Sequence, residues 1–138
     1  MAFAHLSYLA VFIAAATSFV VGALWYGALG KPWMAALGWS EAEIKANTAV
    51  PVAPMIIAFV AELIMAFVLA GVIGHLGPGA ATIKNGLISG AFIWAGFIVT
   101  TLVVNTAYAR RSWMLALIDA GHWLAVLLAQ VAVLGAIG

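Results

Sequence analysis

The sequence predicts an all-α integral membrane protein, a four-helix bundle with a short interfacial helical segment between its first and second helices. Hydrophobic residues make up 67% of the 138 residues and charged residues only 7%, whereas a soluble domain is about half apolar and a quarter charged. Four apolar runs of about 25 residues each are long enough to cross a hydrocarbon core of about 30 Å. This composition excludes a disordered chain and argues against a soluble globular domain.

Four membrane spans in a single transmembrane domain account for most of the chain. The connection over residues 30–50 is the only long one, and that over 75–84 contains the breaker cluster Gly77-Pro78-Gly79. The connection over 110–112 is so short that the third and fourth spans must be antiparallel neighbours. The first apolar run has no Lys or Arg before it, so we expect a retained helix rather than a cleaved signal peptide. The spans are expected at residues 6–29, 51–74, 85–109 and 113–137.

The long connection contains two signals for short helices. Lys31-Pro32-Trp33 begins an apolar stretch in which the proline suits the first turn of a new helix. Ser40 and Glu43 match a capping box, which predicts a second short helix. Trp33 and its apolar neighbours suit a helix that lies in the membrane interface. An aromatic belt is expected at this boundary, formed by Trp25, Tyr26, Trp33, Trp39, Tyr108 and Trp113.

The basic residues are distributed unevenly between the two sides of the predicted bundle. With four spans, both termini lie on one side and the first and third connections lie on the other. Those two connections hold Lys31, Lys45, Arg110 and Arg111, whereas the second connection holds only Lys84. Cytoplasmic loops are enriched in Lys and Arg. We therefore expect a multi-pass protein of the cell inner membrane, with the first and third connections in the cytoplasm and both termini outside.

A few polar residues lie inside the predicted spans. Glu62 is expected near the membrane midplane, and His122 is expected at a similar depth on the fourth span. Asp119, His122 and Gln130 share one helix face. If the second and fourth spans touch, Glu62, Asp119 and His122 form one buried cluster.

This cluster has two interpretations. An acidic residue at the centre of a membrane helix costs about 2.5–3.5 kcal/mol, so it faces the bundle interior, pairs or carries a proton. A carboxylate beside an imidazole is a plausible proton relay or small-ligand site. The alternative is that these residues only hold the helices together by hydrogen bonds. Thr101 and Asn105, on one face of the third span, are expected either to line a cytoplasmic cavity or to bond a neighbouring helix.

Three histidines are candidates for holding haem, a pigment or a metal. His5 and His75 are expected at the outer boundary, whereas a membrane cytochrome holds haem between histidines inside its spans. His122 lies at membrane depth beside Trp123, which leaves ligation of haem or chlorophyll open as a minor alternative. We expect His5 and His75 to be polar surface residues, and the protein to hold no cofactor and no metal.

Composition and motifs argue against several other functions. The net charge is +1 and no basic patch is present, so we expect no nucleic-acid partner. The absence of cysteine excludes disulfides, thiolate metal sites and iron–sulfur clusters. The motifs of serine hydrolases, zinc metalloproteases and phosphate-binding loops are absent as well. We therefore expect that the protein is not an enzyme.

Small residues at four-residue spacing predict close helix contacts. Such patterns let backbones approach, either within one bundle or between protomers. Together with the small size, they favour a structural or accessory subunit, or a self-associating protein, whose partners are the lipid bilayer and a second copy or other membrane subunits. The alternative is a proton-coupled channel or small-molecule carrier that uses Glu62, Asp119 and His122. The expected packing residues are Gly22, Gly86, Gly90, Gly121 and Ala125.

Two stretches of the chain carry a family resemblance. The first is GALWYG at 22–27, followed by GKPWM at 30–34 and LG at 37–38; the second is DAGHWL at 119–124, which runs into VLGAI at 133–137. In order and spacing the chain resembles the bacterial family known as domain of unknown function 1761, which consists of small four-helix membrane proteins. The resemblance implies a four-helix membrane fold and no particular activity. It also implies that Trp25-Tyr26 and Lys31-Pro32-Trp33 form a corner that orders the long connection.

Overall fold

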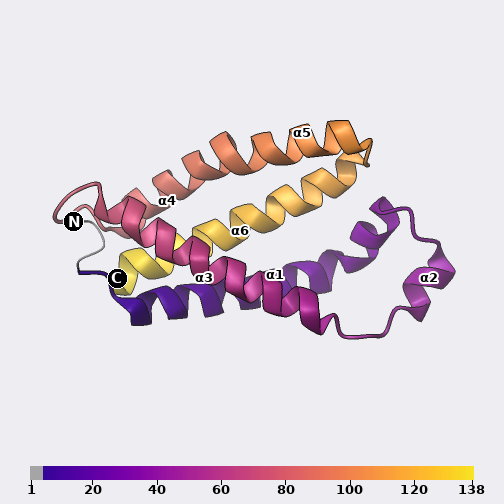
Figure 1. Cartoon of the computed structure of the whole chain (residues 1–138), viewed down its shortest axis with the longest axis horizontal. Coiled ribbons are helices and arrows are strands. Elements are labelled where there is room, and N and C mark those ends of the chain that lie inside the picture. The colour runs from indigo at the N-terminus through magenta and orange to yellow at the C-terminus, as the bar shows by residue number, and fades with distance from the viewer. Residues whose placement is uncertain (1–4) are drawn as a thin grey trace.

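Helices, without any strand, make up the secondary structure of residues 5–138, the part of the chain that our computed structural model describes (Figure 1). Four helices are long and apolar enough to cross a membrane, which confirms the predicted fold class. The third is continuous over Ile83–Ala109 although its middle is π-helical. In chain order the segments are α1 (Tyr8–Ala36), α2 (Glu41–Ala46), α3 (Val52–Gly74), α4 (Ile83–Ile93), η1 (Trp94–Val99), α5 (Thr100–Ala109) and α6 (Trp113–Ile137).

Helices α1 and α6 form the central pair of the bundle and run antiparallel (Figure 1). Helix α3 packs against α1, and the helix made of α4, η1 and α5 packs against α6. The third and fourth spans are thus neighbours, as the short connection between them predicts. We call the end of the bundle that holds α2 and residues 110–112 the α2 end. The opposite end, which holds residues 75–82, is called the α3–α4 end.

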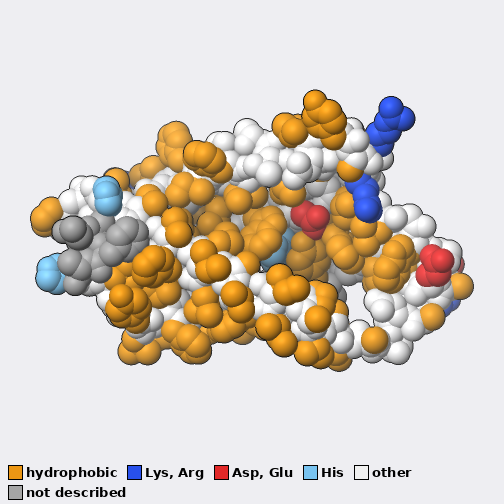
Figure 2. Space-filling model, in the orientation of Figure 1, with side chains coloured by type: hydrophobic (Ala, Val, Ile, Leu, Met, Phe, Trp, Pro, Cys, Tyr) orange, Lys and Arg blue, Asp and Glu red, His pale blue; other side chains and the backbone are white. Residues whose placement is uncertain are grey.

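The surface of the bundle between its two ends is largely apolar (Figure 2). Leu24, Ile57 and Phe92 are among the large apolar side chains exposed there. A surface that faces lipid presents such side chains, whereas a soluble monomer rarely exposes a large contiguous apolar patch. The Lys and Arg side chains visible in this view lie at the α2 end (Figure 2). This distribution indicates a membrane protein.

Helix α1 continues through Pro32 to Ala36. The expectation that Pro32 opens a new helix is therefore wrong, and the helix extends seven residues beyond the expected end of the first span at residue 29. A proline inside a helix removes one backbone hydrogen bond, but the turn that follows it is closed. The N–H of Leu37 donates to the carbonyls of Trp33 and Met34 at 3.0 and 3.1 Å.

The connection between α1 and α3 contains the short helix α2, whose capping box forms as predicted. The N–H of Ser40 donates to Glu43 Oε2 at 2.8 Å, and the N–H of Glu43 donates to Ser40 Oγ at 3.2 Å. The amide of Asn47 donates to the sulfur of Met34 at 3.5 Å, which links this segment to the end of α1. The predicted boundaries of the other three spans lie close to those of the helices.

The middle of the third membrane helix is π-helical over Trp94–Val99, and no sequence pattern indicates this. The indole N–H of Trp94 donates to the carbonyl of Ala120 in α6 at 2.7 Å. The third membrane helix contacts α6 along the side that carries Trp94, and it has the smallest buried share of the four membrane helices. Only 6% of its most apolar stretch is buried, compared with 33% for α1 and for α6.

Glycines on α4 set the distance between α4 and α6. A Cβ at Gly86 would lie 3.0 Å from the carbonyl oxygen of Val131, and a Cβ at Gly90 would lie 3.3 Å from Val131 Cγ2. The two glycines therefore serve close packing within the chain. Their spacing no longer argues for contact with a second copy.

We expect Gly86→Leu to lower the free energy of unfolding by about 2 kcal/mol, because forcing extra carbons into a packed contact costs roughly 1–3 kcal/mol. The matched control is Gly96→Leu, because a Cβ at Gly96 meets no atom within 4 Å. Unfolding in mixed micelles with increasing denaturing detergent measures both variants. Equal stabilities of the two variants would contradict the packing described for Gly86.

Candidate functional site

A row of polar side chains runs inside the bundle from its middle to the α2 end. The side chains come from α1, α3 and α6, the three helices that surround this part of the interior. We call this row the polar file. It consists of Ser18, Tyr26, Trp33, Glu62, Asp119, His122 and Gln130.

The inner end of the polar file joins three helices through Gln130, which is fully buried. The Nε2 of Gln130 donates to Ser18 Oγ at 3.0 Å and to the backbone carbonyl of Glu62 at 2.9 Å. The hydroxyl of Ser18 in turn donates to the carbonyl of Ala15 at 3.0 Å. One amide group of α6 therefore holds both α1 and α3 at this level.

Glu62 and His122 meet over Gly22 of α1. A Cβ at Gly22 would lie 2.8 Å from His122 Nε2 and 3.9 Å from Glu62 Oε1, so the lack of a side chain there makes room for both groups. Side chains in a helix lean toward its N-terminus, which for α3 lies at the α2 end. The carboxyl of Glu62 thus extends from the level of Gln130 toward His122. Glu62 is only 2% exposed and His122 only 7%.

The outer end of the polar file is built around Asp119. The hydroxyl of Tyr26 donates to Asp119 Oδ1 at 2.6 Å, and the indole N–H of Trp33 donates to the same oxygen at 3.0 Å. The Tyr26 ring also packs on the His122 ring, with a centroid distance of 4.7 Å. Tyr26 therefore connects the carboxylate of Asp119 to the imidazole of His122.

The tryptophans next to this cluster fix the same turn of α6. The indole N–H of Trp25 donates to the carbonyl of Ile118 at 3.1 Å. Its ring lies against Gly121, where a Cβ would come within 2.5 Å of the ring. With Trp94 bonded to the Ala120 carbonyl, α6 is held from both sides at this level.

The structure revises the expected interfacial belt. Trp25, Tyr26 and Trp33 turn inward onto α6, because a carboxylate and a backbone carbonyl there accept their polar hydrogens. Lys31 is exposed, as a residue of the membrane boundary would be. The other three aromatic residues of the belt, Trp39, Tyr108 and Trp113, are exposed as well.

Three buried polar atoms of the polar file have no hydrogen-bond partner. They are Glu62 Oε2, His122 Nδ1 and Gln130 Oε1. Leaving a buried donor or acceptor unpaired costs about 1–3 kcal/mol, so such atoms call for an explanation. A carboxyl group and an imidazole that both keep a free atom can take up and release a proton.

Thr101 and Asn105 are not part of this site. Both side chains are exposed, and the hydroxyl of Thr101 donates to the carbonyl of Phe97 in its own helix. The buried position at this level is Thr106, which is one residue and about 100° around the helix from Asn105. Within one copy of the chain, Thr101 and Asn105 therefore do not line a cavity or bond another helix, contrary to the expectation. The predicted packing residue Ala125 is half-buried on α6.

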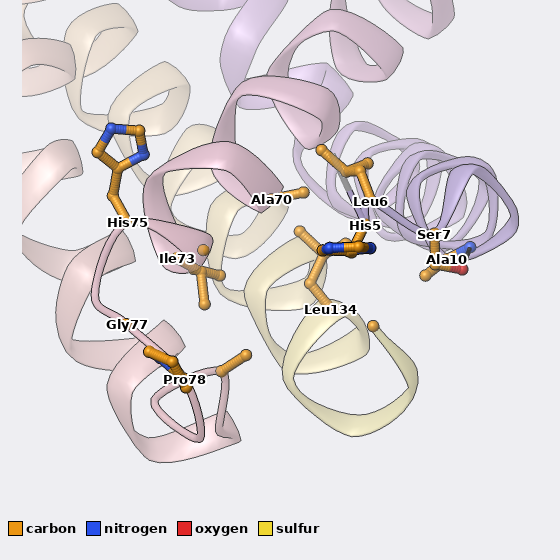
Figure 3. Close-up of a pocket in the computed structure, with 13 residues that line it drawn as sticks. His5, Leu6, Ser7, Ala10, Ala70, Ile73, His75, Gly77, Pro78 and Leu134 are labelled. Carbon is orange, nitrogen blue, oxygen red and sulfur yellow. Dashed lines mark hydrogen bonds between the residues drawn. The ribbon is translucent and has the colours of Figure 1, made fainter. Parts of the chain in front are cut away.

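His5 and His75 line a pocket of about 580 Å³ at the α3–α4 end (Figure 3). The two rings lie apart in the pocket, and the His75 ring is directed away from His5 (Figure 3). Nδ1 of His75 lies 3.3 Å from the carbonyl oxygen of Gly71 in its own helix. Within residues 5–138, no group of three or more His, Cys, Asp and Glu side chains is placed to hold a metal ion.

A family model described as "Protein of unknown function (DUF1761)" matches residues 9–135. The chain belongs to the DUF1761 family. No curated protein and no solved structure matches it. The matched part of this DUF1761 protein includes every member of the polar file.

Two residues that shape the site have only weak signals in the sequence, or none. Ser18 lies one helical turn before Gly22, and a hydroxyl in an apolar helix at the depth of Glu62 could have indicated its role. Trp94 gives no such signal, because its bond to α6 depends on the π-helical segment.

We expect Tyr26→Phe to lower the free energy of unfolding by about 1.5–3 kcal/mol, because it removes a hydrogen bond to a charged group. Tyr108→Phe is the matched control, since Tyr108 is 88% exposed. Chemical shifts of isotope-labelled histidine provide a second measurement, because the His122 ring packs on Tyr26. An unchanged His122 signal in Tyr26→Phe would argue against this contact.

Proposed function

We propose that this DUF1761 protein binds and passes protons within the membrane, as a proton-coupled channel or carrier, and that Glu62 is its proton-binding group. The observation that carries the proposal is the meeting of Glu62 and His122 over Gly22, with one buried atom of each side chain left unpartnered. A purely structural pair would be expected to use these atoms for bonds between helices.

The surroundings of Glu62 favour a carboxyl group that carries a proton. An ionised carboxylate buried without a partner costs several kcal/mol, and Glu62 Oε2 has no hydrogen-bond partner. The neutral acid avoids this cost and has a proton to give. The imidazole of His122 is a suitable acceptor, because its Nε2 lies toward Gly22 on the same side as Glu62 Oε1.

The rest of the polar file leads from this pair toward the α2 end, with a ring contact rather than a hydrogen bond between His122 and Tyr26. His122 packs on Tyr26, and Tyr26 donates to Asp119, which is only half-buried. The α2 end also carries the basic residues of the first and third connections. By the positive-inside rule we place this end in the cytoplasm of a cell with the protein in its inner membrane. The route then opens to the cytoplasm.

Two pockets of the bundle lie away from the pair of Glu62 and His122, which suits a proton better than a larger solute. Pockets of about 580 and 290 Å³ have neither Glu62 nor His122 in their walls. A proton needs no cavity of its own, whereas a bound solute does. The proposal therefore concerns proton binding first, and a co-transported small molecule is the alternative within the same class.

Infrared difference spectroscopy of the lipid-reconstituted protein tests the proposal. A pH step is expected to change the C=O band of a protonated carboxylic acid, and Glu62→Gln is expected to abolish this change. Glu41→Gln, on the exposed helix α2, is the matched control and should leave the band change intact. His122→Ala is expected to alter the pH at which the band changes. A full band change in folded Glu62→Gln protein would refute the assignment of Glu62.

A second candidate function, a structural or accessory subunit or a self-associating protein, is favoured by one observation. The third membrane helix packs on α6 along one side only, and its exposed face includes the amide of Asn105. A partner helix could bury that face and bond that amide.

The native mass of the protein, extracted in mild detergent with its co-purifying chains identified, tests this second function. We expect either a homo-oligomer or a complex with one stoichiometric membrane partner, and Asn105→Leu should weaken it. Asn47→Leu, outside the spans on the α1–α3 connection, is the control. A monomer free of partners would exclude this function.

A further inference from the structure

We infer that the pocket at the α3–α4 end is a water-filled second entrance to Glu62, closed from it by one apolar layer that contains Ala14 and Ala66. This inference rests on the proposed function, because it supplies the access route from the opposite side of the membrane. Its evidence is the position of the pocket relative to the inner end of the polar file.

The pocket lies at the α3–α4 end of the bundle. Its walls come from the start of α1, the ends of α3 and α6, and the connection between α3 and α4 (Figure 3). His5, Ser7 and His75 give this opening polar side chains, and Gly77 and Pro78 belong to the connection itself (Figure 3). A volume of about 580 Å³ is ample for a cluster of water molecules, each of which occupies about 30 Å³ in the liquid.

The inner wall of the pocket lies close to the polar file. Ala10 of α1 and Ala70 of α3 line the pocket. Ser18 and Glu62 follow on the same helix faces, each two helical turns or about 12 Å away. Both faces thus lead from the pocket directly to the group that we propose as the proton-binding site.

A single apolar layer separates the pocket from the inner end of the polar file. Ala14 lies midway between Ala10 and Ser18, and Ala66 lies midway between Ala70 and Glu62; both alanines are fully buried in the hydrophobic core. An apolar constriction keeps out water and ions even when it is short. This layer therefore closes the route, and the core cluster to which it belongs also includes the larger buried side chains of Leu69 and Val131.

Cysteine labelling tests whether the pocket holds water. The chain has no cysteine, so Ala70→Cys provides a unique thiol in the pocket wall. A charged, water-soluble thiol reagent is expected to modify it about tenfold faster than Val68→Cys, since thiolates form poorly in apolar surroundings. Val68 is the matched control, because it is exposed on the same helix but does not line the pocket. Equal, slow labelling of both would show that lipid or protein fills the pocket, and would overturn the inference.

Proton flux into liposomes tests the apolar layer. The double variant Ala14→Ser/Ala66→Ser adds two hydroxyl groups at little cost in volume. We expect it to raise proton flux about tenfold over the unmodified protein, which corresponds to about 1.4 kcal/mol of barrier. Ala91→Ser/Ala95→Ser, at exposed positions of the third membrane helix, is the control and should leave the flux unchanged. Unchanged flux in folded Ala14→Ser/Ala66→Ser protein would overturn the assignment of this layer.

Addition of Glu62→Gln separates this inference from the proposed function. If the route runs through Glu62, the third substitution abolishes the added flux. The added flux could instead persist in the triple variant while the unmodified protein shows no change of the carboxylic acid band. The proposed role of Glu62 then fails, although the pocket still admits water. The unmodified protein could also show the band change while Ala70→Cys labels no faster than Val68→Cys and Ala14→Ser/Ala66→Ser leaves the flux unchanged. The entrance then fails and the role of Glu62 stands.

Discussion

The close approach of α1 and α6 is the constraint on which the rest of the structure depends. One glycine on each helix permits it: Gly22 leaves room for the imidazole of His122, and Gly121 leaves room for the indole of Trp25. The hydrogen bonds of Tyr26 and Trp33 to Asp119 then extend the same contact to the α2 end. Without this spacing, none of these groups could reach its partner.

In hydrocarbon, a polar group must find its partner within the protein. The polar file follows this rule at its outer end, where Asp119 accepts bonds from α1, and in part at its inner end, where Gln130 Nε2 is bonded but Gln130 Oε1 is not. It departs from the rule in the middle, where Glu62 and His122 keep unpartnered atoms. The bundle thus places its best-bonded residues on either side of its least-satisfied ones. Such an arrangement holds two reactive groups in place at a local cost in stability.

The sequence predicted the fold and most residues of the site, because both follow from the length of the apolar runs and from the rare polar residues inside them. Apolar runs long enough to cross a bilayer identify the spans, and the capping box of α2 is a local pattern. Glu62, Asp119, His122 and Gln130 were recognisable because polar residues in apolar helices are rare. The sequence could not give the directions of Tyr26 and Trp33. An aromatic residue near a membrane boundary suits the interface as well as an inward bond to a carboxylate, and only the position of Asp119 decides between them. Asn105 was misplaced for a similar reason, since Thr106 next to it takes the buried position.

The length of α1 has a consequence for how the bilayer acts on the protein. A helix of 29 residues is about 43 Å long, and α3 with 23 residues is about 35 Å long. The hydrocarbon core is only about 30 Å thick, so α1 must tilt or extend into the headgroup layer, and a thinner bilayer increases its tilt. Tyr26 and Trp33 on the outer part of α1 bond Asp119 on α6, so a tilt of α1 relative to α6 would change the distance between them. Membrane thickness is in that case a mechanical variable for the carboxylate end of the polar file.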